Sequence, residues 1–310
     1  MRAYSVRFAS TYNYSAPARN SLHAARLMPV TSALQTVSSA RLDVTPRPSS
    51  SSIRNDFFGN AVNWFRLDEP HDELILTMTA NIKVSDPVTA SAPRSTCGEI
   101  ANKARSLPSL SADAPAHYLA ETMFTRADPQ LVEFARAHLS TDAPILTAAQ
   151  SLCTALKEEV RYDPEATDVT TTAADAFAAR AGVCQDFAHI FIAASCNSGV
   201  PARYVTGYLR TLPPPGQPKL EGADAMHAWV AVWAGTDVGW IEFDPTNGCI
   251  VADDHVRVAV GRDHRDTTPV SGHLLASGKQ RHTVAVDVTE IRPEEPGSTV
   301  MRLPAAHTSD

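Results

Sequence analysis

The chain has 310 residues, 44% of them hydrophobic and 20% charged, which is typical of a globular protein long enough for two domains. The formal charge of −7 and the lack of Lys/Arg runs interleaved with aromatic residues argue against a nucleic-acid partner. No stretch approaches the roughly 18 apolar residues that span a membrane, and the first residues lack the apolar segment of a secretory signal. The sequence therefore predicts a cytoplasmic protein with no membrane partner.

The cysteines do not form a recognisable framework. There are five, an odd number, and no two are spaced as a CxxC pair. This pattern argues against a set of disulfides and against a four-cysteine zinc site, so we expect no metal and no other cofactor. The five are Cys97, Cys153, Cys184, Cys196 and Cys249.

The N-terminal part of the chain is rich in strand patterns. Residues 4–14 alternate large and small side chains, and residues 72–85 form a second long β-rich run. Residues 54–67 have the pattern of a hairpin with Gly59-Asn60 at its tip. These strands predict a β-rich, sandwich-like domain.

Helical spacing follows. Apolar side chains recur at helical intervals in residues 128–140 and 145–162. Residues 171–180 carry a helix start signal, Thr172 with Asp175 three residues later, which is close to a capping box.

A further helix is expected to begin at Cys184, after Gly182 has ended the preceding helix, and to stop at Gly199 and Pro201. Beyond it the pattern changes to strands. Helices followed by antiparallel strands predict the α+β class. The three strand segments are residues 202–209, 227–234 and 239–246.

We divide the chain accordingly. Residues 1–90 form the N-terminal domain, 91–115 a linker, 116–290 the core and 291–310 a flexible tail. The N-terminal domain has three roles open to it: covering one end of a cleft, recruiting a partner or building a homodimer.

Cys184 stands where a helix is expected to begin. A thiol at a helix N-terminus lies near unpaired backbone N–H groups and the partial positive charge of the helix end, which favour the nucleophilic thiolate. Free cysteine is also among the most buried residue types, so the position alone leaves a structural role open.

A thiolate nucleophile needs a base, and the base needs an orienting partner. His227 opens one predicted strand and Asp244 lies near the end of the next, with a turn at Thr236-Asp237 between them. The two residues lie at similar distances from this turn. We therefore expect their side chains to be cross-strand neighbours.

These residues resemble a known family. The order Cys, His, Asp, within "GVCQDFAHIF", "GVPARYVTGYL", "HAWVAVW" and "WIEFDPTNG", is similar to the core of the transglutaminase-like superfamily, a papain-like group of cysteine enzymes. This likeness covers about residues 160–248, and residues 1–85 resemble the β-rich domain that precedes the core in bacterial members. The resemblance implies Cys184 as nucleophile on a helix packed on an antiparallel sheet, His227 as acid/base and Asp244 as orienter.

The reaction is less certain than the triad. Gln185 follows the nucleophile, where animal cross-linking members carry tryptophan, and no calcium loop of spaced acids is present in the sequence. We therefore expect hydrolysis of a peptide or protein amide by a peptidase or amidase. Transfer of the acyl group to an amine, a non-catalytic binding module on the same fold, and a metal-binding protein are the alternatives.

An acyl-transfer site also needs donors for the oxyanion. The backbone N–H of Cys184 is the first candidate, and the family resemblance points to Tyr162 as a second. Tyr162 has the alternative of simple packing at a helix end. Gln185 is a weaker candidate because its side chain points away from position 184 on a helix.

Four further residues lie near the predicted site in the sequence pattern. Asp186 and Trp229 are placed beside the substrate cleft, although Trp229 has the alternative of packing the sheet. Asp186 and His189 share a helix face but lack a third metal ligand at suitable spacing, so a polar contact beside the site is favoured. Arg203 is expected to hold a carboxylate within the fold, with recognition of a substrate carboxylate as the alternative. The Pro-rich loop at residues 211–226 is either a lid or a passive connector.

Overall fold

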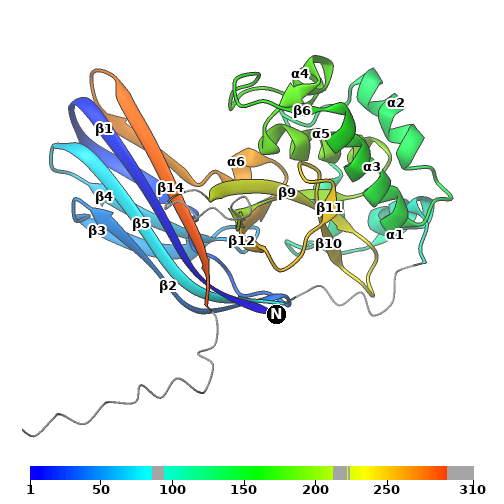
Figure 1. Ribbon diagram of the computed structural model, residues 1–310, viewed down its shortest axis with the longest axis horizontal. Helices are drawn as coiled ribbons and strands as arrows, with labels where there is room; N and C mark the ends of the chain where they lie inside the picture. The colour runs from blue at the N-terminus through cyan, green and yellow to red at the C-terminus, as the bar shows by residue number, and fades with distance from the viewer. Residues whose placement is uncertain (86–93, 212–221, 223, 292–310) are drawn as a thin grey trace, which may run out of the picture.

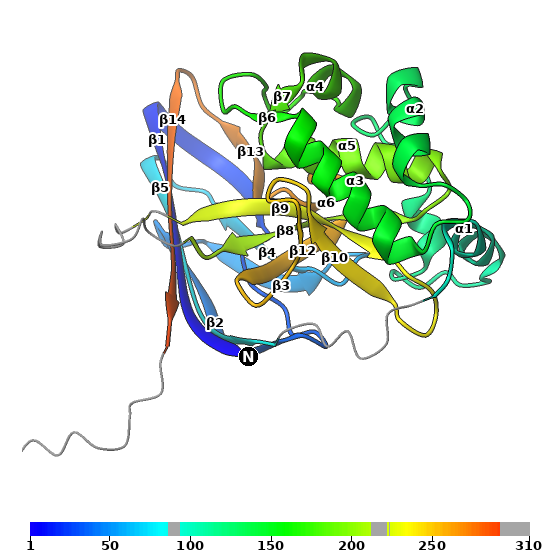
Figure 2. The ribbon, with the colours of Figure 1, turned by 45° about the vertical axis from the view of Figure 1, so that its right-hand side comes forward.

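A computed structural model describes residues 1–85, 94–211, 222 and 224–291 (Figure 1). The predicted tail and most of the predicted loop at 211–226 lie outside this part of the chain. The described residues contain no helix long and apolar enough to cross a membrane. The molecule is α+β, as predicted: a strand-rich domain lies beside a second sheet that is covered by helices (Figures 1 and 2).

One long strand organises the N-terminal domain. The first half of β1, Arg2–Ala25, pairs with β5, and its last residues pair with β4. Every second side chain is buried over residues 4–10 of β1 and 74–84 of β5, which is the alternation expected of a strand with one buried face. The predicted hairpin is confirmed, with Gly59 at φ +84° in its turn. The order is β2-β5-β1-β4-β3, with β2 at Gln35–Thr45, β3 at Ser50–Asn55, β4 at Ala61–Leu67 and β5 at His71–Val84.

The end of the described chain returns to this first sheet. Strands β13, Val270–Leu275, and β14, Gln280–Glu290, both pair antiparallel with β1. The predicted core, which ran to residue 290, is therefore too long. Val286 and Val288 of β14 are buried in the N-terminal domain, so these residues complete that domain in space.

The predicted linker is also partly wrong. Residues 97–106 of it form helix α1, Cys97–Ser106, which begins with a full capping box between Thr96 and Glu99. Ile100 and Ala104 of α1 are buried in the same apolar cluster as the helices of the core. The apolar spacing of α1 thus makes it part of the core rather than a connector.

The remaining helices follow the predicted order. A short 3-10 turn, η1, precedes them at Pro115–Tyr118, and a short helix, α6, lies near the end at His264–Thr267. The predicted cap is present: the Thr172 side chain accepts a hydrogen bond from Asp175 N–H. The main helices are α2 at Pro129–His138, α3 at Ile145–Glu159, α4 at Ala173–Ala179 and α5 at Cys184–Asn197.

The second sheet lies between the helices and the N-terminal domain (Figure 2). Its order is β11-β10-β9-β8-β12, all antiparallel. Side chains such as Val230 and Phe243 pack with α3 and α5, whereas Tyr208 and Val256 pack against the N-terminal domain. Helix α5 is therefore enclosed by this sheet and the other helices. The strands are β8 at Ala202–Leu209, β9 at Ala225–Trp233, β10 at Trp240–Asp244, β11 at Cys249–Ile250 and β12 at His255–Gly261.

Candidate active site

The chain turns sharply before Cys184. Helix α4 ends at Arg180, which adopts a left-handed conformation with φ +50°, so Arg180 and not Gly182 terminates the helix. Gly182 instead lies in the two-residue strand β7, Ala181–Gly182, which pairs with β6, Arg161–Tyr162. A Cβ at Gly182 would lie 2.6 Å from Asp186 Oδ2. Glycine is needed here because the Asp186 carboxylate occupies that space.

Asp186 holds the first turn of α5 in place. Its Oδ2 accepts hydrogen bonds from Val183 N–H at 2.8 Å and from Thr167 Oγ1 at 2.6 Å. Burial is the main cause of a raised pKa for this carboxyl, partly opposed by these two hydrogen bonds. The structure thus places Asp186 inside the protein, where it caps the helix. It is fully buried and does not line an open cleft.

Cys184 is the first residue of α5 and is partly exposed. The backbone N–H groups of Cys184 and Gln185 have no hydrogen-bond acceptor among the described residues, whereas Asp186 N–H donates to Val183 O at 2.8 Å. The other thiols differ. Burial raises the pKa of Cys97 to about 11 and that of Cys196 to about 12, and it also raises the pKa of Cys153 and Cys249. Cys184 is therefore a thiol that is both partly accessible to solvent and located at the N-terminus of a helix.

His227 and Asp244 lie on neighbouring strands, as the hairpin predicted. The register pairs Phe243 with Val230, which places Asp244 beside Trp229 and makes His227 its diagonal neighbour. His227 Nε2 lies 2.8 Å from Asp244 Oδ2, and both side chains are buried. The expected contact is present, although it is diagonal rather than directly opposite.

Asp244 is the most heavily hydrogen-bonded carboxylate of this region. Its Oδ1 accepts from Thr246 N–H and Asn247 N–H, and its Oδ2 accepts from the Asn247 amide at 2.6 Å, from His227 and from His255. Burial alone would raise the pKa of Asp244. The hydrogen bonds from the two histidines, with the charge that these rings carry when protonated, outweigh it and hold the pKa well below its usual range. Asp244 is a permanent buried anion.

This anion controls the protonation of His227. Burial lowers the pKa of His227, but hydrogen bonds with Asp244 and with the Cys184 side chain, and the charges of both groups, raise it to about 10. With this pKa the His227 ring favours the protonated form at neutral pH, and its Nε2 faces Asp244. Cys184 lies close enough to His227 to raise the pKa of the ring, so the structure brings the three predicted residues into one region.

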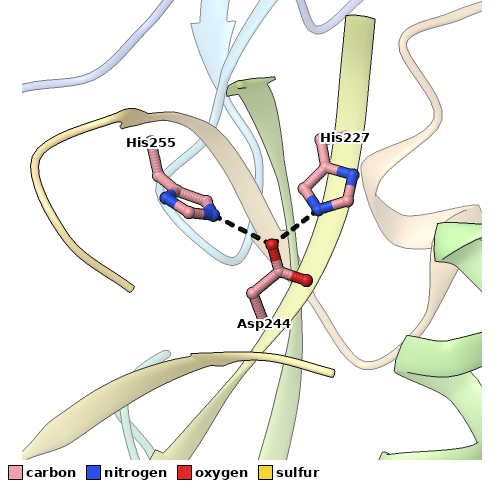
Figure 3. Close-up of side chains that lie close together, drawn as sticks. All are labelled: His227, Asp244 and His255. Atoms are coloured by element: carbon pink, nitrogen blue, oxygen red, sulfur yellow. Dashed lines mark hydrogen bonds and ion pairs between the residues drawn. The ribbon is translucent and has the colours of Figure 1, made fainter. Parts of the chain in front are cut away.

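The sequence analysis missed His255. This residue begins β12, and its Nε2 lies 3.0 Å from the same Asp244 oxygen that His227 contacts. Figure 3 shows the two imidazole rings on either side of the carboxylate. The sequence signal was a histidine at the start of the alternating run "HVRVAV", but a pattern along one strand does not show that a strand on the far side of the sheet reaches Asp244.

His227, Asp244 and His255 also have the residue types of a metal site, and they are the group of this kind found among the described residues. One ligand atom each of His227, Asp244 and His255 lie within 4.8 Å of one another. Each Nε2 also lies at hydrogen-bonding distance from Asp244 Oδ2, so the same atoms form a hydrogen-bonded group.

Both side chains proposed for the oxyanion site lie near Cys184. Gln185 follows it in the chain, and Tyr162 lies on the strand that pairs with the residues before it. Tyr162 pairs with Gly182 across β6 and β7, and its ring is exposed. Burial of its hydroxyl and then the nearby charge of Cys184 raise the pKa of Tyr162. Gln185 is buried beside Cys184 in the first turn of α5. A role for either in binding an oxyanion stays a prediction.

Trp229 packs inside the sheet rather than lining an open surface. It is fully buried, and its Nε1–H donates to Glu242 Oε2 at 2.8 Å. Glu242 in turn pairs with Arg257 of β12. This chain of contacts ties β9, β10 and β12 together, so Trp229 supports the strands that carry the histidines.

Arg203 has the structural role that we favoured. Its guanidinium group donates to Asp113 at 2.7 Å and lies 4.4 Å from the centre of the Trp240 ring. Asp113 precedes η1, so the pair fastens this connecting segment to the sheet.

A cavity of about 640 Å³ separates the N-terminal domain from the second sheet. Residues of both domains line it, including Gln35 on one side and His255 and Arg257 on the other. Cys184, His227 and Asp244 do not line it, whereas His255, which contacts Asp244, does.

Comparison with known proteins agrees with this architecture. Residues 4–83 match the bacterial transglutaminase-like N-terminal region, and residues 132–245 match the transglutaminase-like superfamily. An uncharacterized protein of Mycobacterium tuberculosis is 32% identical over 92% of both chains, and one of Mycobacterium leprae is 30% identical over 90% of this chain and 96% of its own.

Among solved structures, a Cytophaga hutchinsonii protein named as a candidate cysteine protease has a similar fold. The TM-score is 0.72 at 21% identity, over 95% of this chain and 92% of that one. The family matches, the full-length relatives and this fold agree. The chain belongs to the transglutaminase-like superfamily, and it has the general fold of a cysteine enzyme.

Proposed function

We propose that this protein is a cysteine-dependent amide hydrolase in which Cys184, His227 and Asp244 form the catalytic triad. The observation that carries the proposal is the hydrogen bond of 2.8 Å between His227 and the buried Asp244, together with a partly exposed thiol at a helix end whose charge raises the pKa of His227. The three residues come from different elements, and their types are those that acyl transfer by a cysteine enzyme uses.

In the first half of the reaction, Cys184 Sγ attacks the carbonyl carbon of the amide. The negative charge that develops on the carbonyl oxygen lies near the backbone N–H groups of Cys184 and Gln185, which lack acceptors among the described residues. The protonated His227 gives its proton to the leaving nitrogen, the C–N bond breaks and the amine departs. An acyl thioester on Cys184 and a neutral His227 remain.

In the second half, neutral His227 takes a proton from water, and the resulting hydroxide attacks the thioester carbonyl. The C–S bond breaks, the acid leaves and the thiolate–imidazolium pair is restored. Asp244 stays ionised throughout, keeps the imidazole in one orientation and stabilises it while it is charged. The substrate class we propose is a peptide or protein amide.

An amine could replace water in the second half, which would make the protein a transglutaminase. Gln185 after the nucleophile argues against the cross-linking type. Incubation with a panel of N-blocked dipeptide amides and a fluorescent alkylamine separates the outcomes. We expect mass spectrometry to find free acid and ammonia from at least one amide, with the fluorescent amine absent from the product. A product that carries the amine would replace hydrolysis by transfer.

Two controls decide whether any reaction belongs to this site. Cys184→Ala should lose the activity, whereas Cys249→Ser, which changes an exposed thiol away from the helix end, should keep it. Activity that persists in Cys184→Ala would remove the triad. Absence of turnover and of an acyl adduct on Cys184 across the panel would favour the non-catalytic binding module.

The metal reading is a second candidate because His227, Asp244 and His255 have the composition of a metal site. If the residues work as a triad and its support, dialysis against a chelator leaves the activity within about twofold of the untreated protein. If they hold a catalytic metal, the chelator abolishes activity and zinc restores it.

A further inference from the structure

We propose that His255 is a positioning residue for this reaction, which holds Asp244 in the orientation and charge state that His227 needs. The proposal rests on the proposed function, since it assigns a role in the same site. His255 does not touch the nucleophile in this account. It acts through Asp244, from the side of the carboxylate opposite to His227 (Figure 3).

The geometry ties both histidines to one oxygen atom. Asp244 Oδ2 accepts from His227 Nε2 at 2.8 Å and from His255 Nε2 at 3.0 Å, and all three side chains are buried. An ionised carboxylate only accepts hydrogen bonds, so His255 must carry a proton on Nε2. The ring therefore donates a charge-assisted hydrogen bond to the anion that orients His227.

The hydrogen bond to Asp244 also explains why a histidine, and not an apolar residue, occupies position 255. His255 Nδ1 is buried and has no hydrogen-bond partner among the described residues. An apolar side chain of similar size would fill the same space without leaving a buried nitrogen unpaired. A histidine at position 255 is therefore costly unless its Nε2–H serves Asp244.

The second sheet is shaped to bring His255 to Asp244. Strands β9 and β8 lie between β10 and β12 in the sheet order, so only a strongly curled sheet lets these two residues meet. Gly207 of β8 permits the curl, because a Cβ there would lie 2.6 Å from the Trp229 ring and would clash with the Val256 carbonyl. The Trp229 ring fills this gap and packs edge-on against His255, with ring centres 5.1 Å apart.

Further contacts hold β12 at this distance. Arg257, two residues after His255 on the same strand, pairs with Glu242, and Glu242 accepts the Trp229 indole N–H. Side chains two apart on a strand share a face, so His255 and Arg257 both point into the curl. The ion pair sets how far β12 reaches toward β10 and thereby sets the distance from His255 to Asp244.

Two variants separate a donor from a space-filling ring. His255→Leu keeps apolar bulk but removes the hydrogen bond, whereas His255→Gln keeps an N–H donor without the ring. The measurement is the alkylation rate of Cys184 by iodoacetamide at pH 6 and pH 8, followed by peptide mapping. It needs no substrate, and thermal unfolding of each variant reports its folding.

We expect the rate at pH 6 to fall about tenfold or more in His255→Leu, within the 10- to 100-fold range for loss of an outer-shell partner at metal sites. His255→Gln should stay within about threefold of the wild type, because its amide N–H still reaches the carboxylate. If a substrate is at hand, kcat should fall in His255→Leu with KM little changed.

Two results would overturn the proposal. A folded His255→Leu protein that alkylates like the wild type would show that Asp244 needs no second histidine. The second result is a His255→Gln protein in which Cys184 is alkylated at least tenfold more slowly than in the wild type. It would show that the imidazole ring matters and not its N–H donor, even if His255→Leu fails to fold. Wild-type Cys184 that reacts no faster than Cys249 would instead overturn the proposed function, and this inference with it.

Discussion

Two of the buried histidines, His227 and His189, have pKa values shifted in opposite directions. His227, beside Asp244, has a pKa raised to about 10, whereas burial lowers the pKa of His189, in the middle of α5, to about 3. His189 is enclosed by the Phe124 and Tyr204 rings, and its Nε2 accepts the backbone N–H of His264. His189 thus contacts aromatic rings and a backbone amide, whereas His227 contacts a carboxylate.

The comparison shows what turns a buried imidazole into a reactive one. Burial penalises the charged form at both sites, and among the described residues no anion near His189 reverses this penalty. At His227 the Asp244 carboxylate reverses it. His189 is thus a neutral packing residue with one polar contact beside the site, and His227 is a charged group poised for proton transfer.

Removal of the Cys184 thiol, the group next to His227, should have the largest effect on activity. Cys184→Ala should reduce amide turnover by about 10⁴-fold or more, because no other described residue replaces the nucleophile. The fold should be kept, with the thermal midpoint within about 2 °C. Cleavage assays and differential scanning calorimetry measure the two effects, and Cys249→Ser is the matched control.

Asp244→Asn should have the next largest effect. The substitution removes the anion, so His227 loses the charge that raises its pKa, and we expect turnover to fall by about 10²- to 10⁴-fold. Cys184 remains present and alkylatable. Initial rates and a thiol titration measure these outcomes. An Asp244→Asn variant with wild-type activity would show that His227 does not depend on this carboxylate.

His189 should matter to stability and not to chemistry. Its folded-state pKa of about 3 lies below the ordinary value of 6.5, so the unfolded chain takes up a proton first as the pH falls. Its contribution is therefore complete above about pH 6.5 and is lost toward pH 3, on the order of a few kcal/mol. Urea unfolding measures this at several pH values.

In His189→Phe, stability at pH 7 should fall by about 1–2 kcal/mol, because the His264 N–H loses its acceptor. The decline between pH 6.5 and pH 3 should become shallower, although His23, with a pKa lowered to about 4, still contributes to it. Activity should stay within about threefold of the wild type. A large loss of activity in a folded His189→Phe protein would place His189 in the chemistry.

The smallest expected effect is at alkaline pH. The folded-state pKa of His227, about 10, lies above the ordinary value of 6.5, so its contribution to stability is complete below pH 6.5 and is lost as the pH rises toward 10. In Cys184→Ala the thiol no longer raises this pKa, and the alkaline loss of stability should be smaller. Equal alkaline loss in both proteins would show that His227 and Cys184 are not coupled.

Much of this arrangement was readable from the sequence. The hairpin pattern predicted the contact between His227 and Asp244, because residues at similar distances from a tight turn become cross-strand neighbours; the contact is diagonal. The glycine before an apolar run placed Cys184 at a helix end. These are local features, which a pattern of neighbouring residues determines.

What the sequence did not reveal depends on contacts between distant segments. His255 reaches Asp244 through the curl of a sheet in which two strands separate them, and β14 returns to β1 across most of the chain. Asp186 looked like a cleft residue, but its burial follows from the turn at Arg180 and the space left by Gly182. No periodicity along one segment encodes such contacts.

Whether Cys184 and His227 work as a pair is decided by the alkylation of Cys184 with iodoacetamide at pH 6, in the wild type and in His227→Ala. We expect Cys184 to react at least ten times faster than Cys249 in the wild type, and this advantage to disappear in a folded His227→Ala protein. Equal rates for Cys184 in the two proteins would contradict this expectation.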